Sequence, residues 1–267
     1  MDKFKGKAIY NPSGRAGEYS YWACNFYKGC SNGCTYCYLK NGILKKTLGG
    51  DNPELKQCFR DAEQAKEIFK KEVIQNLNEL KKFGLFLTFS SDPFLPETID
   101  LTLFAIRFCL SHNVPVKLLT KNNPLEFYPF HNCADIVRRN VAFGLTLTGH
   151  DELEPRASTN SERINALVKL HNAGFITWAS IEPIIEVEDS INMIDAVGNH
   201  VDLVKIGLLS GRKYETLELI DMIPQVDLMA RAHGFKVYFK DSFLLQTKVR
   251  REELPDYCVK RDYNIFK

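Results

Sequence analysis

After residue 80 the chain alternates between short apolar runs and longer amphipathic stretches, and this alternation limits its possible folds more than any other feature. The runs are rich in Val, Ile, Leu and Phe, as buried strands are. They occupy residues 85–89, 116–120, 141–146, 175–181, 201–206 and 236–239. The stretches between them are long enough for helices, most clearly at residues 97–111, 161–173, 190–199 and 214–232. Strands that alternate with helices pair in parallel, so the pattern predicts an α/β fold.

The region before residue 85 extends this pattern by one unit. Residues 61–82 place apolar side chains on one face and Lys, Glu, Gln and Asn on the other, which predicts a single long helix. Gly84 is available to end that helix. Residues 21–28 are the best candidate for the first strand. Counted along the whole chain, the pattern gives about six strand–helix units. Such units form either a barrel or an open doubly wound sheet. Periodicity does not decide between the two.

The length and composition fit one domain. The chain has 267 residues, of which 45% are hydrophobic, and no linker or repeat divides it. We expect a single domain over residues 1–267, with the core at about residues 20–245 and a C-terminal tail at 246–267. Within this tail, residues 250–267 are polar and of mixed charge, so we expect them to be loosely ordered.

The net charge of +2 neither requires nor excludes a polyanionic partner. No apolar run reaches the roughly 18 residues of a membrane span, and the N-terminus lacks the apolar segment of a signal peptide. We therefore expect a cytoplasmic protein with no membrane association. In that compartment we expect no disulfide framework among its eight cysteines.

Three of these cysteines, Cys30, Cys34 and Cys37, fall within eight residues. Gly29 and Gly33 give the backbone the freedom to wrap the thiolates around one inorganic centre. Thiolates select zinc, copper(I) or iron–sulfur clusters. A cubane cluster normally takes four cysteines, and no fourth follows at motif spacing, so three thiolates would leave one iron open for a small ligand. The alternative is a zinc site completed by Cys24, Cys58 or a distant histidine.

The spacing Cys-x3-Cys-x-Tyr-Cys resembles the signature of the radical S-adenosylmethionine superfamily. The flanking segments resemble its spore photoproduct lyase-related branch. The segments that carry this resemblance are Arg15 to Ser20, Asn25 to Cys30, Tyr38, Ser91 to Glu97, Leu119 to Asn122 and Glu154 to Ala157. The resemblance runs from about residue 10 to about residue 245, and it implies a partial (β/α)6 TIM-type barrel with parallel strands.

The resemblance also implies a set of cofactors and an activity. Cys30, Cys34 and Cys37 would hold a [4Fe–4S] cluster whose open iron binds the amino and carboxylate groups of S-adenosylmethionine. An electron from the cluster would cleave the sulfonium and release a 5′-deoxyadenosyl radical, which removes a hydrogen atom from the substrate. Such a cluster works at the low end of the potential range, so a flavodoxin-type or ferredoxin-type electron donor is implied.

By position in the motif, Tyr36 would lie against the adenine. The turn Ser90-Ser91-Asp92 would contact the methionyl amino group, although Asp92 could equally be a helix N-cap. Lys121 resembles the lysine that pairs with the methionyl carboxylate; otherwise it is a solvated loop lysine.

Three further polar residues follow predicted strands. Thr146 and Thr148 resemble hydroxyls near the ribose or carboxylate, but Thr is also an ordinary strand residue. Glu182 either reaches the ribose or the substrate or serves in a turn. Lys205 lies inside a predicted strand, so its charge points either into the barrel or out to solvent.

One departure from the branch limits the substrate. Photoproduct lyases return a hydrogen atom from a cysteine on the second strand, and residues 85–90 contain none. Cys109 or Cys133 could replace it only if folding brings one to the barrel mouth. The resemblance, together with the slight basic bias, therefore implies a radical enzyme of the lyase or transferase class that acts on a macromolecular, nucleic-acid-like substrate. A peptide or small-molecule substrate, or a non-catalytic zinc or iron–sulfur module, are the alternatives.

Overall fold

The computed structural model describes residues 3–41, 45–127 and 133–267. The strands within these ranges are β1 (Ile9–Tyr10), β2 (Ala23–Cys24), β3 (Tyr27–Lys28), β4 (Glu54–Leu55), β5 (Leu85–Leu87), β6 (Val116–Thr120), β7 (Val141–Thr146), β8 (Ile176–Ile184), β9 (Leu203–Leu208) and β10 (Lys236–Phe239). The helices are α1 (Tyr38–Asn41), α2 (Lys45–Leu48), α3 (Ala62–Gln75), α4 (Leu77–Phe83), α5 (Ile99–Ser111), α6 (Asp135–Asn140), α7 (Asn160–Asn172), α8 (Val187–Val197), α9 (Thr216–His233) and α10 (Asp241–Thr247).

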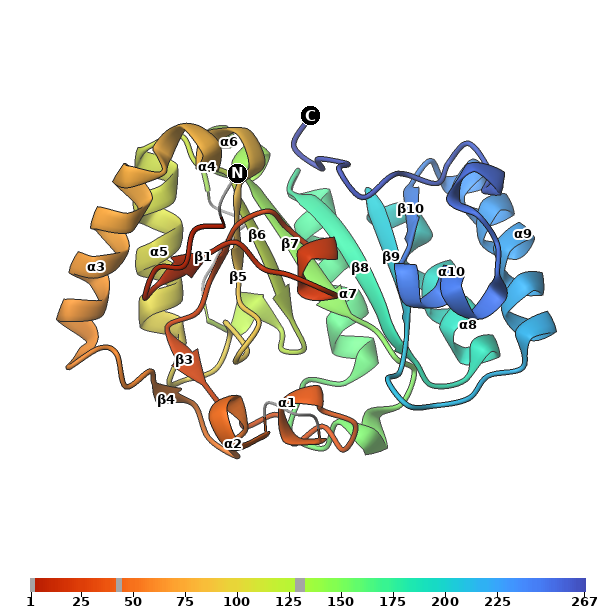
Figure 1. The fold of residues 1–267 in the computed structure, drawn as a ribbon. Helices are drawn as coiled ribbons and strands as arrows, with labels where there is room; N and C mark the ends of the chain where they lie inside the picture. The colour runs from red at the N-terminus through yellow and green to blue at the C-terminus, as the bar shows by residue number, and fades with distance from the viewer. Residues whose placement is uncertain (1–2, 42–44, 128–132) are drawn as a thin grey trace.

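The main sheet has the strand order β1-β2-β5-β6-β7-β8-β9-β10. Every neighbouring pair from β2 to β10 is parallel, and β1 pairs antiparallel with β2. A doubly wound sheet reverses its strand order at a switch point, whereas this order follows the chain from β2 to β10. Sequential crossovers of one hand place the helices on one face, so the sheet curls around its other face (Figure 1). The predicted partial barrel is confirmed, and its sheet is not closed.

The helices cover the outside of this curled sheet over two apolar clusters. One cluster packs α3 and α5 against β5 to β7, and the other packs α7, α8 and α9 against β7 to β10. Helix starts are set by local side chains: Asp61 accepts from the backbone N–H of Gln64 before α3, and Thr159 and Glu162 form a capping box before α7. None of the helices in the described ranges is long and apolar enough to cross a membrane.

The inner face of the sheet holds a third apolar cluster, which includes Phe86, Trp178 and Tyr238. Val259, Ile265 and Phe266 of the C-terminal tail pack against it. Cys258 forms a bridge to Val237 at the start of β10, and the Asn264 side chain donates to the Lys82 carbonyl before β5. The expectation of a loosely ordered tail is wrong, because its apolar residues cover the inner face where the amino ends of the strands lie.

The first predicted strand, residues 21–28, is divided at Asn25. Only Ala23–Cys24 joins the main sheet, and Tyr27–Lys28 pairs with β4 in a separate ribbon. The Asn25 side-chain oxygen accepts from the Thr88 hydroxyl and from the Phe89 N–H. Hydrogen bonds to the Asn25 side chain thus replace the backbone pairing between β2 and β5 at this point. From here the chain leaves the main sheet, and β3 leads into the cysteine loop.

The helix predicted over residues 61–82 is likewise divided, at Asn76. The Asn76 side chain donates to the Glu72 carbonyl at 2.8 Å, and its backbone leaves the helical conformation. An amide side chain that binds the carbonyl four residues earlier competes with the helical hydrogen bond. Two helices, α3 and α4, therefore replace the single predicted one.

Strand β8 is longer than the predicted run at residues 175–181. It continues to Ile184, with a shift in its register against β9 between Ile181 and Ile184. Proline is tolerated in a strand at such an irregularity, so Pro183 does not end β8. Glu182 consequently lies within the strand rather than in a turn.

Candidate active site at the carboxyl ends of the parallel strands

The cysteine loop connects β3 to α1. Its two glycines have positive φ angles, +79° at Gly29 and +75° at Gly33, as the predicted tight wrapping requires. A Cβ on Gly29 would overlap the backbone oxygen of Asn52, so this position also lacks space for a side chain. The loop is joined to the loop after β7 by a backbone hydrogen bond from Thr35 to Leu153.

The three thiols of this loop are free and lie at different depths. Cys34 is buried, and Cys30 and Cys37 are partly exposed. Burial, with a contribution from Asp92, raises the pKa of Cys30 to about 12. Burial likewise raises the pKa of Cys34 to about 11, although Lys121 opposes the increase. Both are protonated at neutral pH, so metal binding here would release protons.

The donor set of this loop fits an iron–sulfur cluster. No three His, Cys, Asp or Glu side chains in the described ranges are grouped so that they could hold a single metal ion. A cubane presents its irons at separate corners, so its thiolates do not need to converge on one point. The three thiols nevertheless lie close enough that Cys34 and Cys37 influence the ionisation of Cys30.

Asp92 joins the cysteine loop to the ends of β5 and β6. Its buried carboxylate accepts from the Asn32 amide at 3.0 Å, the Thr120 hydroxyl at 2.7 Å, the Lys121 N–H at 2.9 Å and the Phe94 N–H at 2.9 Å. Burial raises the pKa of Asp92, and these four donors oppose the increase. The carboxylate therefore has a structural role, and its predicted contact with a methionyl amino group stays a prediction.

The two serines of the same turn differ in their partners. The Ser90 hydroxyl is buried and donates to the Tyr27 carbonyl. The Ser91 hydroxyl is also buried, and it has no hydrogen-bond partner among the described residues. Of the three residues predicted to hold the amino group, Ser91 is therefore the one with an uncommitted acceptor.

Glu154 brings together two of the other predicted cofactor residues. Its carboxylate accepts a hydrogen bond from the Tyr36 hydroxyl, and it lies 3.1 Å from Lys121 Nζ. The same Nζ lies 5.4 Å from the centre of the Tyr36 ring. Lys121 is thus not a solvated loop residue: it points at Tyr36 beside the cysteine loop.

Glu154 is itself held by Arg163, whose side chain is fully buried. Burial would raise the pKa of Glu154, but Lys121 and Arg163 together lower it to about 2. Burial and then Glu154 raise the pKa of Tyr36. The predicted threonines border this group: the Thr146 carbonyl accepts from Arg163 at 2.6 Å, and the Thr148 hydroxyl lies 3.4 Å from Glu154. Sequence reasoning assigned no role to Glu154 or Arg163, although Glu154 stands in one of the segments that carry the resemblance.

Glu182 lies in a second polar group, inside the barrel. Its carboxylate accepts from the Tyr19 hydroxyl and pairs with Lys240 Nζ at 2.7 Å. Lys205 points inward, which settles the alternative that the sequence left open. It donates to the Glu18 carbonyl at 2.8 Å and lies 4.9 Å from the Tyr19 ring centre. Burial, with Lys117 and Lys240 nearby, lowers the pKa of Lys205.

Little in the sequence predicts this interior group. A lysine inside an apolar run, as at Lys205 and Lys117, is the signal that could have found it. Glu18 and Tyr19 lie between β1 and β2, so only the fold shows that they enter the barrel. Neither Cys109 nor Cys133 belongs to this group, because Cys109 lies on α5 within the outer cluster and Cys133 packs against that same cluster.

Comparisons with known proteins identify the fold. No protein-family model matches the sequence, and no curated protein matches it. Among solved structures, a spore photoproduct lyase variant with dinucleoside spore photoproduct superposes with a TM-score of 0.62 at 14% identity, covering 83% of this chain and 77% of that one. A second variant, with bound AdoMet and dinucleoside spore photoproduct, gives a TM-score of 0.59 at 12% identity, covering 83% and 76%. The chain therefore has the fold of spore photoproduct lyase, as the resemblance in its sequence predicts.

Proposed function

We propose that this protein is a radical S-adenosylmethionine enzyme that acts on a nucleic-acid-like substrate. The observation that carries the proposal is the arrangement at the cysteine loop. Three free thiols stand beside Tyr36 and Lys121, two residues suited to an adenine and a carboxylate, at the carboxyl end of a partial barrel. The likeness to a spore photoproduct lyase structure with bound AdoMet supports the same cofactor.

Cys30, Cys34 and Cys37 would hold a [4Fe–4S] cluster, which supplies the low-potential electron that starts radical chemistry on S-adenosylmethionine. The protein's own residues bind and orient the cofactor. Lys121 offers an ammonium to a carboxylate, and the uncommitted Ser91 hydroxyl offers an acceptor to an amino group. The buried Glu154–Arg163 pair fixes Lys121 and Tyr36 in position.

The interior of the barrel is the proposed place of the substrate. Its inner face combines aromatic residues with the polar group around Glu182, Lys240 and Tyr19, so it can orient a substrate with both apolar and polar parts. A radical must be kept from water and from other C–H bonds, and the tail that covers the opposite end of the barrel contributes to that exclusion.

The class of substrate rests on two observations. The neighbouring structures contain a dinucleoside photoproduct. Three lysines, Lys117, Lys205 and Lys240, face the barrel interior, where their amino groups can donate hydrogen bonds to a substrate rich in oxygen acceptors. Because residues 85–90, which include β5, contain no cysteine, we propose a reaction other than direct photoproduct repair. A cytoplasmic location and a flavodoxin-type or ferredoxin-type electron donor complete the proposal.

The experiment is anoxic purification followed by addition of dithionite and S-adenosylmethionine. The expected result is a brown protein that forms 5′-deoxyadenosine. A colourless protein with stoichiometric zinc would instead support the non-catalytic alternative. Enzyme-dependent deuterium transfer from labelled cell fractions into 5′-deoxyadenosine would then show whether the substrate is a nucleic acid, a peptide or a small molecule.

A further inference from the structure

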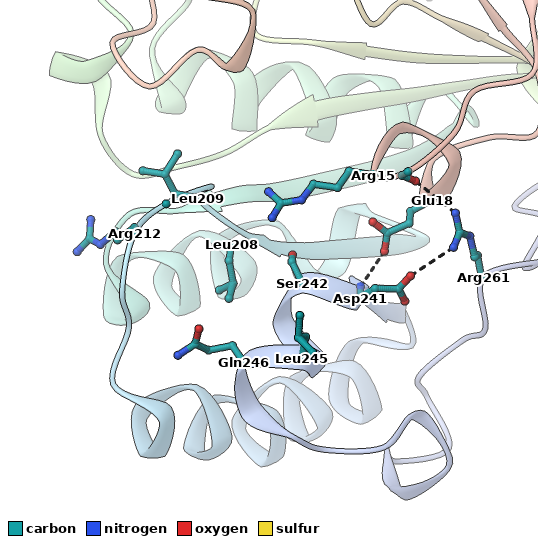
Figure 2. Close-up of a pocket in the computed structure, with 12 residues that line it drawn as sticks. Arg15, Glu18, Leu208, Leu209, Arg212, Asp241, Ser242, Leu245, Gln246 and Arg261 are labelled. Atoms are coloured by element: carbon teal, nitrogen blue, oxygen red, sulfur yellow. Dashed lines mark hydrogen bonds and ion pairs between the residues drawn. The ribbon is translucent and has the colours of Figure 1, made fainter. Parts of the chain in front are cut away.

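A pocket of about 500 Å³ lies at the carboxyl ends of β9 and β10, apart from the cysteine loop (Figure 2). Four segments distant in sequence form it: residues 14–18, residues 208–212 at the end of β9, residues 241–246 of α10, and Arg261 of the tail. Its size is typical of pockets that bind small organic ligands. None of the residues predicted from the sequence to bind a cofactor lines it.

Three arginines, Arg15, Arg212 and Arg261, line this pocket. Arg15 donates to the Ser210 hydroxyl, and no ion pair joins it to a carboxylate within the described ranges. Arg212 pairs with Glu186 at 2.6 Å, and Arg261 pairs with Asp241 at 3.3 Å. Both carboxylates have side chains that are 56% exposed, and ion pairs in such positions contribute little. The guanidinium groups can therefore be recruited by a stronger anion.

Asp241 does not neutralise the arginines around it. The same carboxylate also pairs with Arg251 at 2.7 Å, so two guanidinium groups share one negative charge. The other acidic residue of the pocket, Glu18, accepts from the Asp241 N–H at 2.7 Å and from Tyr238 at 3.1 Å. The Glu18 carboxylate is therefore occupied by hydrogen bonds within the protein. The arginines are the charged groups that remain available to a ligand.

Two other features of the pocket indicate what kind of ligand it can bind. The Ser242 hydroxyl is buried and has no partner among the described residues. The Leu245 side chain is 82% exposed and stands among these charged groups. A wall that combines guanidinium groups, an uncommitted hydroxyl and an exposed apolar side chain suits a ligand with a phosphate attached to an apolar body.

The pocket is also close to the barrel interior. Glu18, which lines it, lies 3.8 Å from Lys240, and Lys240 pairs with Glu182 at 2.7 Å. A ligand anchored by Arg15 and Arg261 would thus be two side chains away from Glu182, which faces the interior.

We propose that this pocket binds a phosphate group of a nucleotide substrate, with Arg15 and Arg261 as its principal contacts. The proposal rests on the proposed function and adds to it the place where the substrate backbone is anchored. The phosphate can belong to a strand or to a free nucleotide, because the chemistry of recognition is the same.

The test uses the anoxically reconstituted enzyme and a fluorescent oligothymidylate, whose binding is followed by anisotropy at several salt concentrations. Arg15→Ala should weaken binding about tenfold and reduce the salt dependence by about one unit of log–log slope. Arg261→Ala should act in the same direction, and Arg15→Lys should restore part of the affinity. Arg139→Ala is the matched control, because Arg139 is exposed on α6.

Competition identifies the source of the phosphate. Thymidine 5′-monophosphate should displace the oligonucleotide better than thymidine does, since only the former carries the phosphate. If the monophosphate competes as well as the unlabelled oligonucleotide, the natural ligand is a free nucleotide. If the monophosphate competes much more weakly, the natural ligand is a nucleic-acid strand. In either case, the proposal requires that Arg15→Ala binds the oligonucleotide more weakly than the wild type does.

Unchanged affinity and salt slope in both Arg15→Ala and Arg261→Ala overturn this inference, as does the absence of any binding by the wild type. Formation of 5′-deoxyadenosine without substrate is measured in the same samples and should be unchanged in the control Arg139→Ala. Its absence in the wild type contradicts the proposed function itself, so the two failures are distinguishable.

Discussion

Lys121 Nζ lies 3.1 Å from a carboxylate oxygen of Glu154, in a part of the site where Glu154 is fully buried. The lysine predicted to bind the carboxylate of the cofactor is therefore already oriented by a carboxylate of the protein. Because a third group, Arg163, neutralises Glu154 from the other side, Lys121 keeps the capacity to pair with a second anion.

Lys121→Ala should weaken the binding of S-adenosylmethionine by roughly tenfold to a hundredfold, the usual effect of losing a hydrogen bond to a charged group. Its iron content should equal that of the wild type. Equilibrium dialysis under anoxic conditions measures the affinity, and Lys66→Ala on the surface of α3 is the control. An unchanged affinity would refute the carboxylate role.

Glu154→Gln should lower the free energy of unfolding by about 3 kcal/mol at neutral pH, since the buried Arg163 loses its closest counter-charge and keeps only Asp151 at 3.7 Å. The pKa of Glu154 is depressed to about 2, so its contribution is complete above the unfolded value near 4.5 and is lost as the pH falls towards 2. Urea unfolding at several pH values should show the gap between wild type and variant closing over that range. The exposed Glu97→Gln should show no gap, and a Glu154→Gln gap that is independent of pH would contradict the assignment.

Lys117→Met should stabilise the protein by roughly 1 to 2 kcal/mol at pH 7, because burial lowers the pKa of Lys117 to about 8. The magnitude is less than full burial would give, because the residue retains some exposure. The charged form is the disfavoured one, so the advantage of the variant should shrink as the pH rises from about 8 towards 10.5. Thermal unfolding at pH 7 and pH 10 measures it. A variant that is less stable than the wild type at both pH values would contradict this prediction. It would mean that the hydrogen bond from Lys117 to the Tyr19 carbonyl stabilises the protein by more than burial of the charge destabilises it.

Cys30→Ala, Cys34→Ala and Cys37→Ala should each abolish the formation of 5′-deoxyadenosine, because each removes one ligand of the proposed cluster. Cys58→Ala and Cys24→Ala should retain both iron and activity. Iron and acid-labile sulfide are measured together with product. Loss of the cluster in Cys58→Ala or Cys24→Ala would mean that the ligand set is wrong.

Much of the fold followed from periodicity because each strand and helix buries one face. The runs at residues 116–120, 141–146 and 236–239 have the observed bounds of β6, β7 and β10. The errors occurred where a single side chain competes with the backbone, as Asn25 and Asn76 do. The spacing of apolar residues along the chain carries no information about such hydrogen bonds.

For the site, the cysteine loop and Lys121 could be located from motif spacing, since both follow directly from chain position. The roles of Glu154, Arg163, Glu18 and Tyr19 could not. Their partners lie far away in sequence, as Tyr36 and Glu154 do, so only the packing of the loops after β3, β6 and β7 brings these charges together.

The central claim is that three cysteines hold a cluster with one iron left open. Electron paramagnetic resonance of the reduced, anoxic protein with and without S-adenosylmethionine tests it most directly. We predict a [4Fe–4S] signal that changes when S-adenosylmethionine is added to the wild type and is absent in Cys34→Ala. A protein without iron, or a signal that S-adenosylmethionine leaves unchanged, would contradict the account.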